Sequence, residues 1–385
     1  MGSSHPTKHS KKSLPQFWGW MGFIWLAILN EGVHANDANP RQHEKPAAVN
    51  SLDFRQSGDG RKQLIKSGTD TIEALLFLPD DAPRTTPPPV YVLAGGMGSV
   101  KEASSTYMAR QIQRRGAAAI TFDYRYWGAS GGRPRHLVVP ARQMEDLKAV
   151  VNHVIDTGGF AGLVDPLRIH LVGLSLGAGH VLTLAAQFCR DNDEKLRRSV
   201  RTVTAVAPYL HPKGVATSLS VGSVTRALHL AALATADLVA AAFGSRPIYV
   251  DLFGPSDGSQ LSVLQIKGDE LKLWQKLKGN RPPVQVAARS ICYINEYRPL
   301  DTVSHVRVPT LFVSGEKDTT TSADLTKEAA TRINTACAGR PQLAETVSMP
   351  TSHLGFLTYP VLDEVVNKIQ AFTEKWEGHR PELQA

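Results

Sequence analysis

The residues best suited to covalent chemistry lie in the pentapeptide Gly173-Leu174-Ser175-Leu176-Gly177. An apolar, β-branched run from Arg168 to Val172 precedes it, and a small-residue stretch of helical character follows from Ala178 to Ala186. G-x-S-x-G between a strand and a helix is the pattern of a sharp turn that lifts a serine hydroxyl above the sheet edge. Its two glycines are expected because a Cβ at either position would collide with a neighbouring strand or helix. The pattern predicts that Ser175 is a nucleophile. The alternative is an ordinary turn with a solvated serine.

A serine hydroxyl needs a base that takes its proton and an acid that orients the base. Behind a turn of this kind, the acid and then the histidine follow the serine along the chain. Asp318 stands after the predicted strand Pro309 to Ser314, and His353 lies in a loop before the last predicted helix. The order and spacing therefore predict Asp318 as the acid and His353 as the base.

Other residues could in principle take these roles. Glu316 lies nearer the strand end than Asp318, and Asp324 falls on a predicted helix surface. Three further histidines are weaker candidates for the base: His180 inside the helix after the serine, His305 on another segment, and His136, which could line the site.

Acyl transfer through a serine also needs two N–H donors for the oxyanion of the tetrahedral intermediate. We expect the backbone N–H of Leu176, directly after the serine, to be one donor. We expect the backbone N–H of Met97, in the loop Gly95-Gly96-Met97-Gly98, to be the other. The alternative for this loop is a flexible turn. A phosphate-binding loop is excluded because neither glycine-rich phosphate motif is present.

The elements that must position these residues indicate the α/β fold class. Predicted strands alternate with helices from Val90 to Pro208, which is typical of a mostly parallel sheet with helices on both faces. A predicted hairpin, with its turn at Gly68-Thr69-Asp70, precedes this part. We assign residues 61–208 and 305–377 to this core. In such sheets the active site lies at the carboxyl ends of the strands, where Ser175 and the Gly95–Gly98 loop both fall.

The alternation stops between residues 209 and 304, which we predict to be an inserted helical cap. Leu228 to Phe243 forms a strongly apolar stretch with helical character, and a polar helical stretch follows around Leu271 to Leu277. The apolar stretch is too short to span a membrane and contains His229 and Asp237. A cap helix over an apolar substrate pocket fits this pattern better.

The N-terminal residues 1–35 have the pattern of a secretory signal peptide. A basic start precedes the apolar run Phe17 to Leu29, and a small-residue ending allows cleavage after Ala35. We expect secretion or export to a periplasm. The alternative is an uncleaved membrane anchor at residues 17–29, in which case the protein would contact a membrane. Residues 36–60 have the composition of a linker, and residues 378–385 form a tail.

Composition excludes several other classes of site. The net charge is +8, but no basic stripe carries interleaved aromatic residues, so we predict no nucleic-acid binding. The three cysteines, Cys189, Cys292 and Cys337, are far apart and form no C-x-x-C, which favours buried or free thiols over a zinc site, although one disulfide stays open. No metal or organic cofactor is implied.

Taken together, these residues resemble the α/β-hydrolase superfamily over about residues 60–377. A narrower set of motifs is similar to dienelactone-hydrolase-like proteins and to fungal polyketide transferases and thiohydrolases. This set comprises Lys101-Glu102, Phe122-Asp-Tyr-Arg125, Gly128-Ala-Ser-Gly131, Pro134-Arg135 followed by Pro140 and Gln143, Arg246-Pro-Ile-Tyr-Val250 and Gly254-Pro255. The resemblance implies the α/β-hydrolase fold and a triad of Ser175, Asp318 and His353. One departure is Gly95-Gly96, where family members commonly carry His-Gly. It bears on the rigidity of the loop and the polarity of the pocket.

The sequence therefore predicts a serine hydrolase that cleaves a small carboxylic ester or thioester through an acyl-enzyme. The apolar cap favours a hydrophobic acyl group. Two alternatives stay open: an acyltransferase or thiohydrolase acting on a polyketide-like acyl group, and a binding protein that keeps this fold without turnover.

Overall fold

The computed structural model describes residues 60–80, 85–214, 224–278, 284–338 and 342–377. These residues all belong to one compact unit, Gln56–Ala385. The predicted signal peptide at 1–35, nearly all of the predicted linker at 36–60 and the tail at 378–385 lie outside the described residues. Those three assignments therefore remain predictions.

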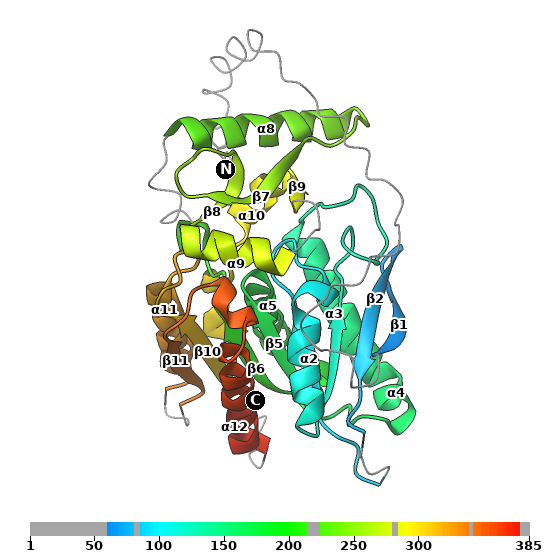
Figure 1. The fold of residues 1–385 in the computed structure, drawn as a ribbon. Coiled ribbons are helices and arrows are strands. Elements are labelled where there is room, and N and C mark those ends of the chain that lie inside the picture. Colours follow the sequence, from blue (N-terminus) through cyan, green and yellow to red (C-terminus); the bar gives the residue numbers. More distant parts are fainter. Residues whose placement is uncertain (1–59, 81–84, 215–223, 279–283, 339–341, 378–385) are drawn as a thin grey trace, which may run out of the picture. The chain divides into compact units, whose positions relative to one another are not determined.

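An eight-stranded sheet forms the centre of this unit, in the order β1-β2-β4-β3-β5-β6-β10-β11 (Figure 1). The six strands from β4 to β11 are parallel, while β1 and β2 form an antiparallel hairpin and β2 pairs antiparallel with β4. The strands span β1 Arg61–Ser67, β2 Asp70–Phe77, β3 Val90–Ala94, β4 Ala118–Phe122, β5 Ile169–Leu174, β6 Val200–Val206, β10 Thr310–Gly315 and β11 Ala344–Met349. The mostly parallel sheet and its N-terminal hairpin confirm the predicted fold class.

Helices cover both faces of this sheet (Figure 1). On one face α2 packs against α12, and on the other α3 packs against α5. The helices of the core span α2 Ser105–Arg114, α3 Pro140–Asp156, α4 Gly158–Gly162, α5 Leu176–Arg190, α6 Glu194–Ser199, α11 Ala323–Ala336 and α12 Val361–Glu377. The predicted core helices and strands form, with ends that differ by a few residues.

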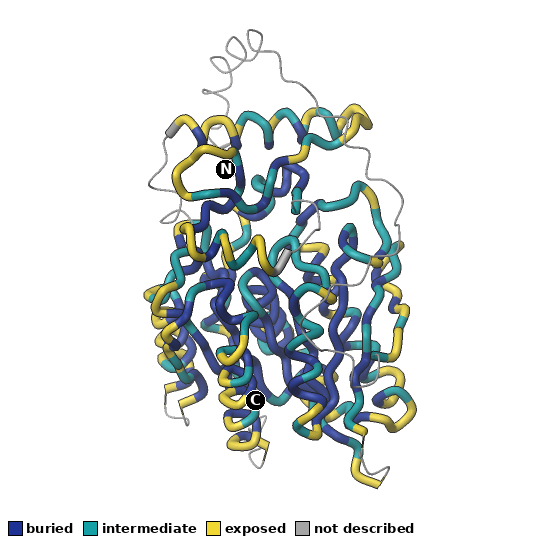
Figure 2. Tube along the Cα trace, in the orientation of Figure 1, coloured by how far each residue is buried: buried dark blue, intermediate teal, exposed yellow. Residues whose placement is uncertain are grey.

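The core lies along the central strands, where buried residues follow one another (Figure 2). Every residue of β3 and β4 is buried. Strands covered on both faces have no solvent side, so they are apolar throughout instead of alternating. This explains why short apolar runs, and not alternating ones, marked the strands in the sequence.

The segment between β6 and β10 contains more than the predicted helices. Besides α8 Val224–Ala242, α9 Gly268–Lys278 and α10 Ser290–Glu296, it forms a three-stranded sheet in the order β8-β7-β9. These strands span β7 Tyr249–Pro255, β8 Ser262–Ile266 and β9 Gln285–Ala287. The helical description of the cap is therefore incomplete.

The physical reason lies in β7, whose burial alternates with a period of two. Glycine and proline are loop-forming residues in isolation, so Gly254-Pro255 hides this strand in the sequence. In the structure Gly254 is a strand residue, and a Cβ there would lie 2.5 Å from Ser262 Oγ of the neighbouring strand. The glycine thus permits the close approach of β8 and does not break β7.

The apolar helix α8 is a cap element. Its Asp237 is fully buried and accepts hydrogen bonds from the backbone N–H groups of Ile248 and Arg289, both 2.9 Å. Across the described ranges, the helices are all too short or too polar to cross a membrane.

Candidate active site

Ser175 occupies a strained turn between β5 and α5. Its φ of 55° and ψ of −117° are values that non-glycine residues rarely adopt. Two backbone hydrogen bonds hold the turn, from Ser175 N to Val206 O at 2.9 Å and from Tyr209 N to Ser175 O at 3.0 Å. The neighbouring strand β6 and the chain after it therefore fix the serine backbone, and its hydroxyl is available for other contacts.

The two glycines that flank this turn have no room for a side chain. A Cβ on Gly173 would overlap Gly177 O and lie 2.5 Å from the backbone of Ala178. A Cβ on Gly177 would overlap the carbonyl oxygens of Ala94 and Gly95 at the end of β3. Both positions therefore need glycine, as expected from the sequence. The glycine at 177 lets the start of α5 lie directly against the end of β3 and the loop that follows it.

The structure brings the three predicted triad residues together in one hydrogen-bonded line. His353 Nε2 lies 3.1 Å from Ser175 Oγ, and His353 Nδ1 lies 2.8 Å from Asp318 Oδ2. Asp318 follows β10 and His353 precedes the short turn Leu354–Leu357. These loops and the turn that carries Ser175 all lie at the carboxyl ends of the parallel strands, which explains how residues so far apart in the sequence meet.

Asp318 is held as a carboxylate by its surroundings. Burial alone would raise its pKa, but the charge of His353 and hydrogen bonds from His353 and Thr321 outweigh burial and lower the pKa. Its Oδ1 accepts from the backbone N–H of Thr320 and Thr321, and its Oδ2 accepts from the Thr321 hydroxyl at 2.8 Å. The carboxylate therefore stays charged and fixed beside the imidazole.

The same interaction acts in the opposite direction on His353. Burial lowers the pKa of the imidazole, but the charge and hydrogen bond of Asp318, together with the charge of Glu270, outweigh burial and raise the pKa above the ordinary value of a histidine. A raised pKa makes the imidazole a stronger base toward the serine proton.

The rejected alternatives lie elsewhere. Glu316 and Asp324 are exposed, and so is His305. His180 is fully buried, with hydrogen bonds to Tyr297 and Gln143, and burial lowers its pKa to about 3. His136 stacks on Trp127 with the ring centroids 4.9 Å apart. None of these five side chains bonds to Ser175 in the described part of the chain.

Of the two predicted oxyanion donors, Leu176 directly follows the serine, and Met97 lies in a loop that passes close to it. Leu176 is the first residue of α5, so its N–H has no acceptor within the helix. It lies at the positive end of the helix dipole, which favours a negatively charged oxygen. The loop that carries Met97 approaches the serine at Gly96, where a Cβ would lie 3.3 Å from Ser175 Cβ and 3.9 Å from Ser175 Oγ. A small oxygen could be bound between these two backbone segments.

The loop after β3 is anchored by a buried ion pair that sequence reasoning missed. Asp123, at the end of β4, accepts from the backbone N of Lys101 at 2.7 Å and from its Nζ at 2.6 Å. Both side chains are completely buried, and Glu73 lies 3.0 Å from the same ammonium. Lys101-Glu102 stood out in the sequence only as a family motif, and nothing local pointed to Asp123 as its partner.

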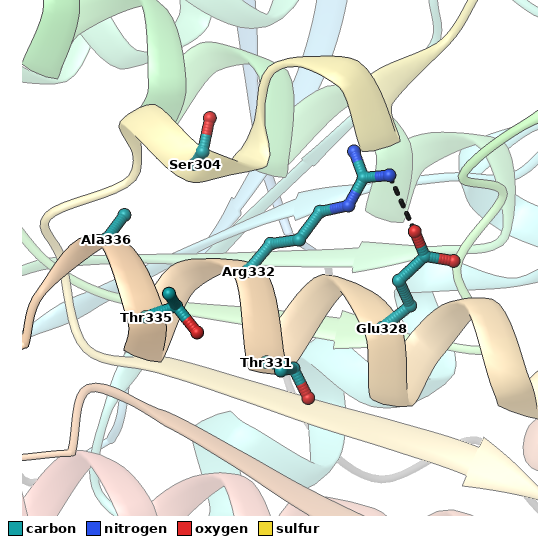
Figure 3. Close-up of a pocket in the computed structure, with 6 residues that line it drawn as sticks. All are labelled: Ser304, Glu328, Thr331, Arg332, Thr335 and Ala336. Atoms are coloured by element: carbon teal, nitrogen blue, oxygen red, sulfur yellow. Dashed lines mark hydrogen bonds and ion pairs between the residues drawn. The ribbon is translucent and has the colours of Figure 1, made fainter.

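A hollow elsewhere on the described surface lies apart from the triad. Figure 3 shows an open hollow between α11 and the turn before β10, lined by Ser304, Glu328, Thr331, Arg332, Thr335 and Ala336. It includes none of the three triad residues. Among the described residues, no group of three metal-binding side chains comes together.

The three cysteines are free thiols in the structure. Cys337 is buried, and burial raises the pKa of Cys189 to about 11. The Cys189 thiol is therefore held in its unreactive, protonated form.

Comparison with known proteins gives a family match and several relatives for this chain. A family model described as "Alpha/beta hydrolase family" matches residues 90–363. The chain is 32% identical to "Quorum-quenching protein AidA" of Acinetobacter baumannii over 231 residues, which cover 60% of this chain and 70% of that protein. It is 26% identical to "Polyketide transferase grgF" of Penicillium over 234 residues, which cover 60% of this chain and 71% of that protein.

Solved structures show the same fold. The crystal structure of GrgF from Penicillium matches 83% of this chain and 99% of that chain, with a TM-score of 0.65 and 20% identity. A structure described as DcsB in complex with its substrate analogue matches 83% of this chain and 100% of that chain, with a TM-score of 0.64 and 20% identity.

Proposed function

This chain belongs to the alpha/beta hydrolase family, and from that premise we propose that it is a serine hydrolase acting on a small carboxylic ester or thioester. The observation that carries the proposal is the hydrogen-bonded line from Ser175 through His353 to Asp318. The strained backbone of Ser175 supports it, because such strain persists only where the surrounding structure enforces it.

In the proposed first step, Ser175 Oγ attacks the carbonyl carbon while His353 Nε2 takes the hydroxyl proton. Asp318 keeps the other ring proton on Nδ1 and stabilises the imidazolium that forms. The carbonyl oxygen becomes an oxyanion, for which the N–H groups of Leu176 and Met97 are the candidate donors. The tetrahedral intermediate then collapses, and the alcohol or thiol leaves with the proton from His353.

In the second step, water attacks the acyl-enzyme. His353 takes a proton from the water, the acyl–oxygen bond to Ser175 breaks, and Ser175 Oγ recovers the proton. The products are a carboxylic acid and the free enzyme, so the cycle needs no further reactant.

The surroundings of the Gly95–Gly98 loop, called the oxyanion loop below, favour an apolar acyl group. A Cβ on Gly98 would overlap Leu252 of β7, lie 3.1 Å from Val284 and lie 3.5 Å from Trp127. Apolar cap side chains thus pack directly beside the loop that carries Met97. Such side chains favour hydrocarbon over charged substrate groups.

Acyl transfer is the second candidate, because one of the relatives is named a polyketide transferase. The chemistry would be the same up to the acyl-enzyme, and an alcohol or amine would then replace water. Adding such nucleophiles to a hydrolysis assay separates the two. Transfer is favoured if the ester or amide product outweighs the acid at nucleophile concentrations far below that of water.

The hydrolase proposal is tested by comparing the wild type with Ser175→Ala on p-nitrophenyl esters and acyl thioesters of increasing chain length. We expect Ser175→Ala to lose about 10⁴-fold or more in kcat/KM. Ser256→Ala, which changes an exposed cap serine, should retain wild-type activity. Equal activity in Ser175→Ala would refute the proposal. Absence of turnover in the wild type on every substrate, with tight binding of an acyl ligand, would favour a binding protein.

We also propose that the protein is exported, which the N-terminal sequence alone supports. The basic start, the apolar run from Phe17 to Leu29 and the small-residue ending at Ala35 are typical of a signal peptide. N-terminal sequencing of the exported protein should begin at Asn36. An intact N-terminus in the membrane fraction would favour the anchor instead.

A further inference from the structure

The cap contributes one buried carboxylate to the loop that carries His353. Glu270, on the first turn of α9, is 6% exposed. Its Oε1 accepts a hydrogen bond from the backbone N–H of Leu354 at 3.1 Å. Buried carboxylates are costly unless they are bonded to other groups, so this contact calls for a functional reason.

The position of the hydrogen bond gives that reason. Leu354 directly follows His353 and begins the short turn Leu354–Leu357. The first N–H groups of such a turn have no acceptor within it. Glu270 supplies the acceptor from an element 84 residues away, and α9 packs against this turn, which is the orange segment before α12 in Figure 1.

Two independent sets of contacts therefore fix the base. Asp318 and Ser175 bond to the two ring nitrogens of His353, while Glu270 bonds to the backbone beside it. The charged groups facing His353 are Asp318, from the loop after β10, and Glu270, from α9. Both carry negative charge, so both favour the imidazolium.

We propose that Glu270 is a positioning residue through which the cap holds the His353 loop in register with Ser175. The base is then aligned by the cap as well as by the sheet, and its alignment depends on α9 remaining docked. This inference rests on the proposed function, because it assumes that His353 is the base for Ser175.

The test compares Glu270→Gln and Glu270→Ala with Asp269→Asn, which removes a charge from an exposed neighbour on the same turn. The readout is the rate at which a fluorophosphonate probe labels Ser175, measured as a function of pH. Glu270→Gln keeps the acceptor oxygen but removes the charge. We expect it to keep the high-pH labelling rate within about threefold and to move the midpoint of the profile to lower pH, because the negative charge raises the pKa of His353.

Glu270→Ala removes the acceptor as well. We expect its high-pH labelling rate to fall by about 10- to 100-fold, because small displacements of a catalytic base have effects of this size. Asp269→Asn should match the wild type in both rate and midpoint. Thermal unfolding shows whether each variant is folded. If Glu270→Ala does not fold, the midpoint of the Glu270→Gln profile decides the outcome. The proposal is overturned if neither Glu270 variant differs from Asp269→Asn.

An NMR titration of the His353 ring in the wild type and Glu270→Gln separates this inference from the proposed function. If the probe never labels Ser175, the hydrolase proposal fails. The titration still tests Glu270, because it needs no activity. A lower His353 pKa in Glu270→Gln supports the contact between cap and base, and an unchanged pKa contradicts it.

Discussion

The nucleophile turn and the loops around it are held in place by different kinds of interaction. The turn depends on backbone packing, with Gly173 and Gly177 leaving no space for a side chain. The loops depend on buried charges: Asp123 with Lys101 behind the oxyanion loop, and Asp318 beside His353. The serine is therefore positioned by shape, and its partners by electrostatics.

This difference has a physical consequence. Among the described residues, the hydrogen bonds to the Ser175 backbone come from other backbone groups and from no ionisable side chain, so its geometry should not change with pH. The His353 side does titrate, because Asp318 raises the pKa of the imidazole while the pKa of Asp318 itself is lowered. As pH falls, the imidazole is therefore protonated and lost as a base while Asp318 is still charged and the turn persists. Substitutions can separate the two contributions.

The largest effect is expected from Asp318→Asn. The amide cannot stabilise the imidazolium and can favour the wrong ring tautomer, so we expect kcat to fall by about 10⁴-fold. Loss of the carboxylate charge also lowers the pKa of His353, so the residual activity should reach its plateau at lower pH than in the wild type. Asp324→Asn, an exposed change on α11, should leave the pH–rate profile unaltered. An Asp318→Asn profile equal to the wild type would show that electrostatics do not hold this side of the site.

The next effect tests the packing side with alanine substitutions at two glycines, Gly177 and Gly95. In Gly177→Ala the new Cβ would overlap the carbonyl oxygens of Ala94 and Gly95, so the serine must shift. We expect an activity loss of about 10²- to 10³-fold. In Gly95→Ala the Cβ would lie 3.4 Å from Ser99 Oγ and 3.9 Å from Ser104 Oγ, which are ordinary van der Waals contacts. We therefore expect activity within about threefold of the wild type. Equal losses in the two variants would contradict the steric account.

A smaller effect on activity, but a large one on stability, is expected from Asp123→Asn. The change leaves the Lys101 ammonium buried without its main counter-charge, and breaking such a pair costs about 3–5 kcal/mol. Glu102→Gln removes a half-exposed partner of the same ammonium, and exposed pairs contribute about 1 kcal/mol or less. Urea unfolding of both variants measures the difference, and a similar loss in both would show that the buried pair does not anchor the loop.

The parts of the site that were predictable from sequence are those with a local signature. The strand, glycines and helix around Ser175 lie within one continuous stretch, and the positions of Asp318 and His353 follow from their order after strand ends. The central sheet was equally predictable from the sequence, because strands buried on both faces form apolar runs.

The parts that could not be predicted depend on contacts between distant segments. Asp123 and Lys101 meet only once β4 lies beside β3, and Glu270 reaches Leu354 only through the packing of the cap. The strand β7 was obscured by Gly254-Pro255, which is a loop signal in isolation and a close strand contact in the fold. Such pairs have no spacing rule in the sequence.

The central claim is that Ser175 is the activated nucleophile, and peptide mapping of a fluorophosphonate adduct tests it most directly. The wild type should carry a single adduct on the peptide that contains Ser175. Ser175→Ala should carry none, and His353→Gln should react far more slowly although its serine is intact. An adduct on another residue, or labelling of Ser175 that is independent of His353, would contradict the account.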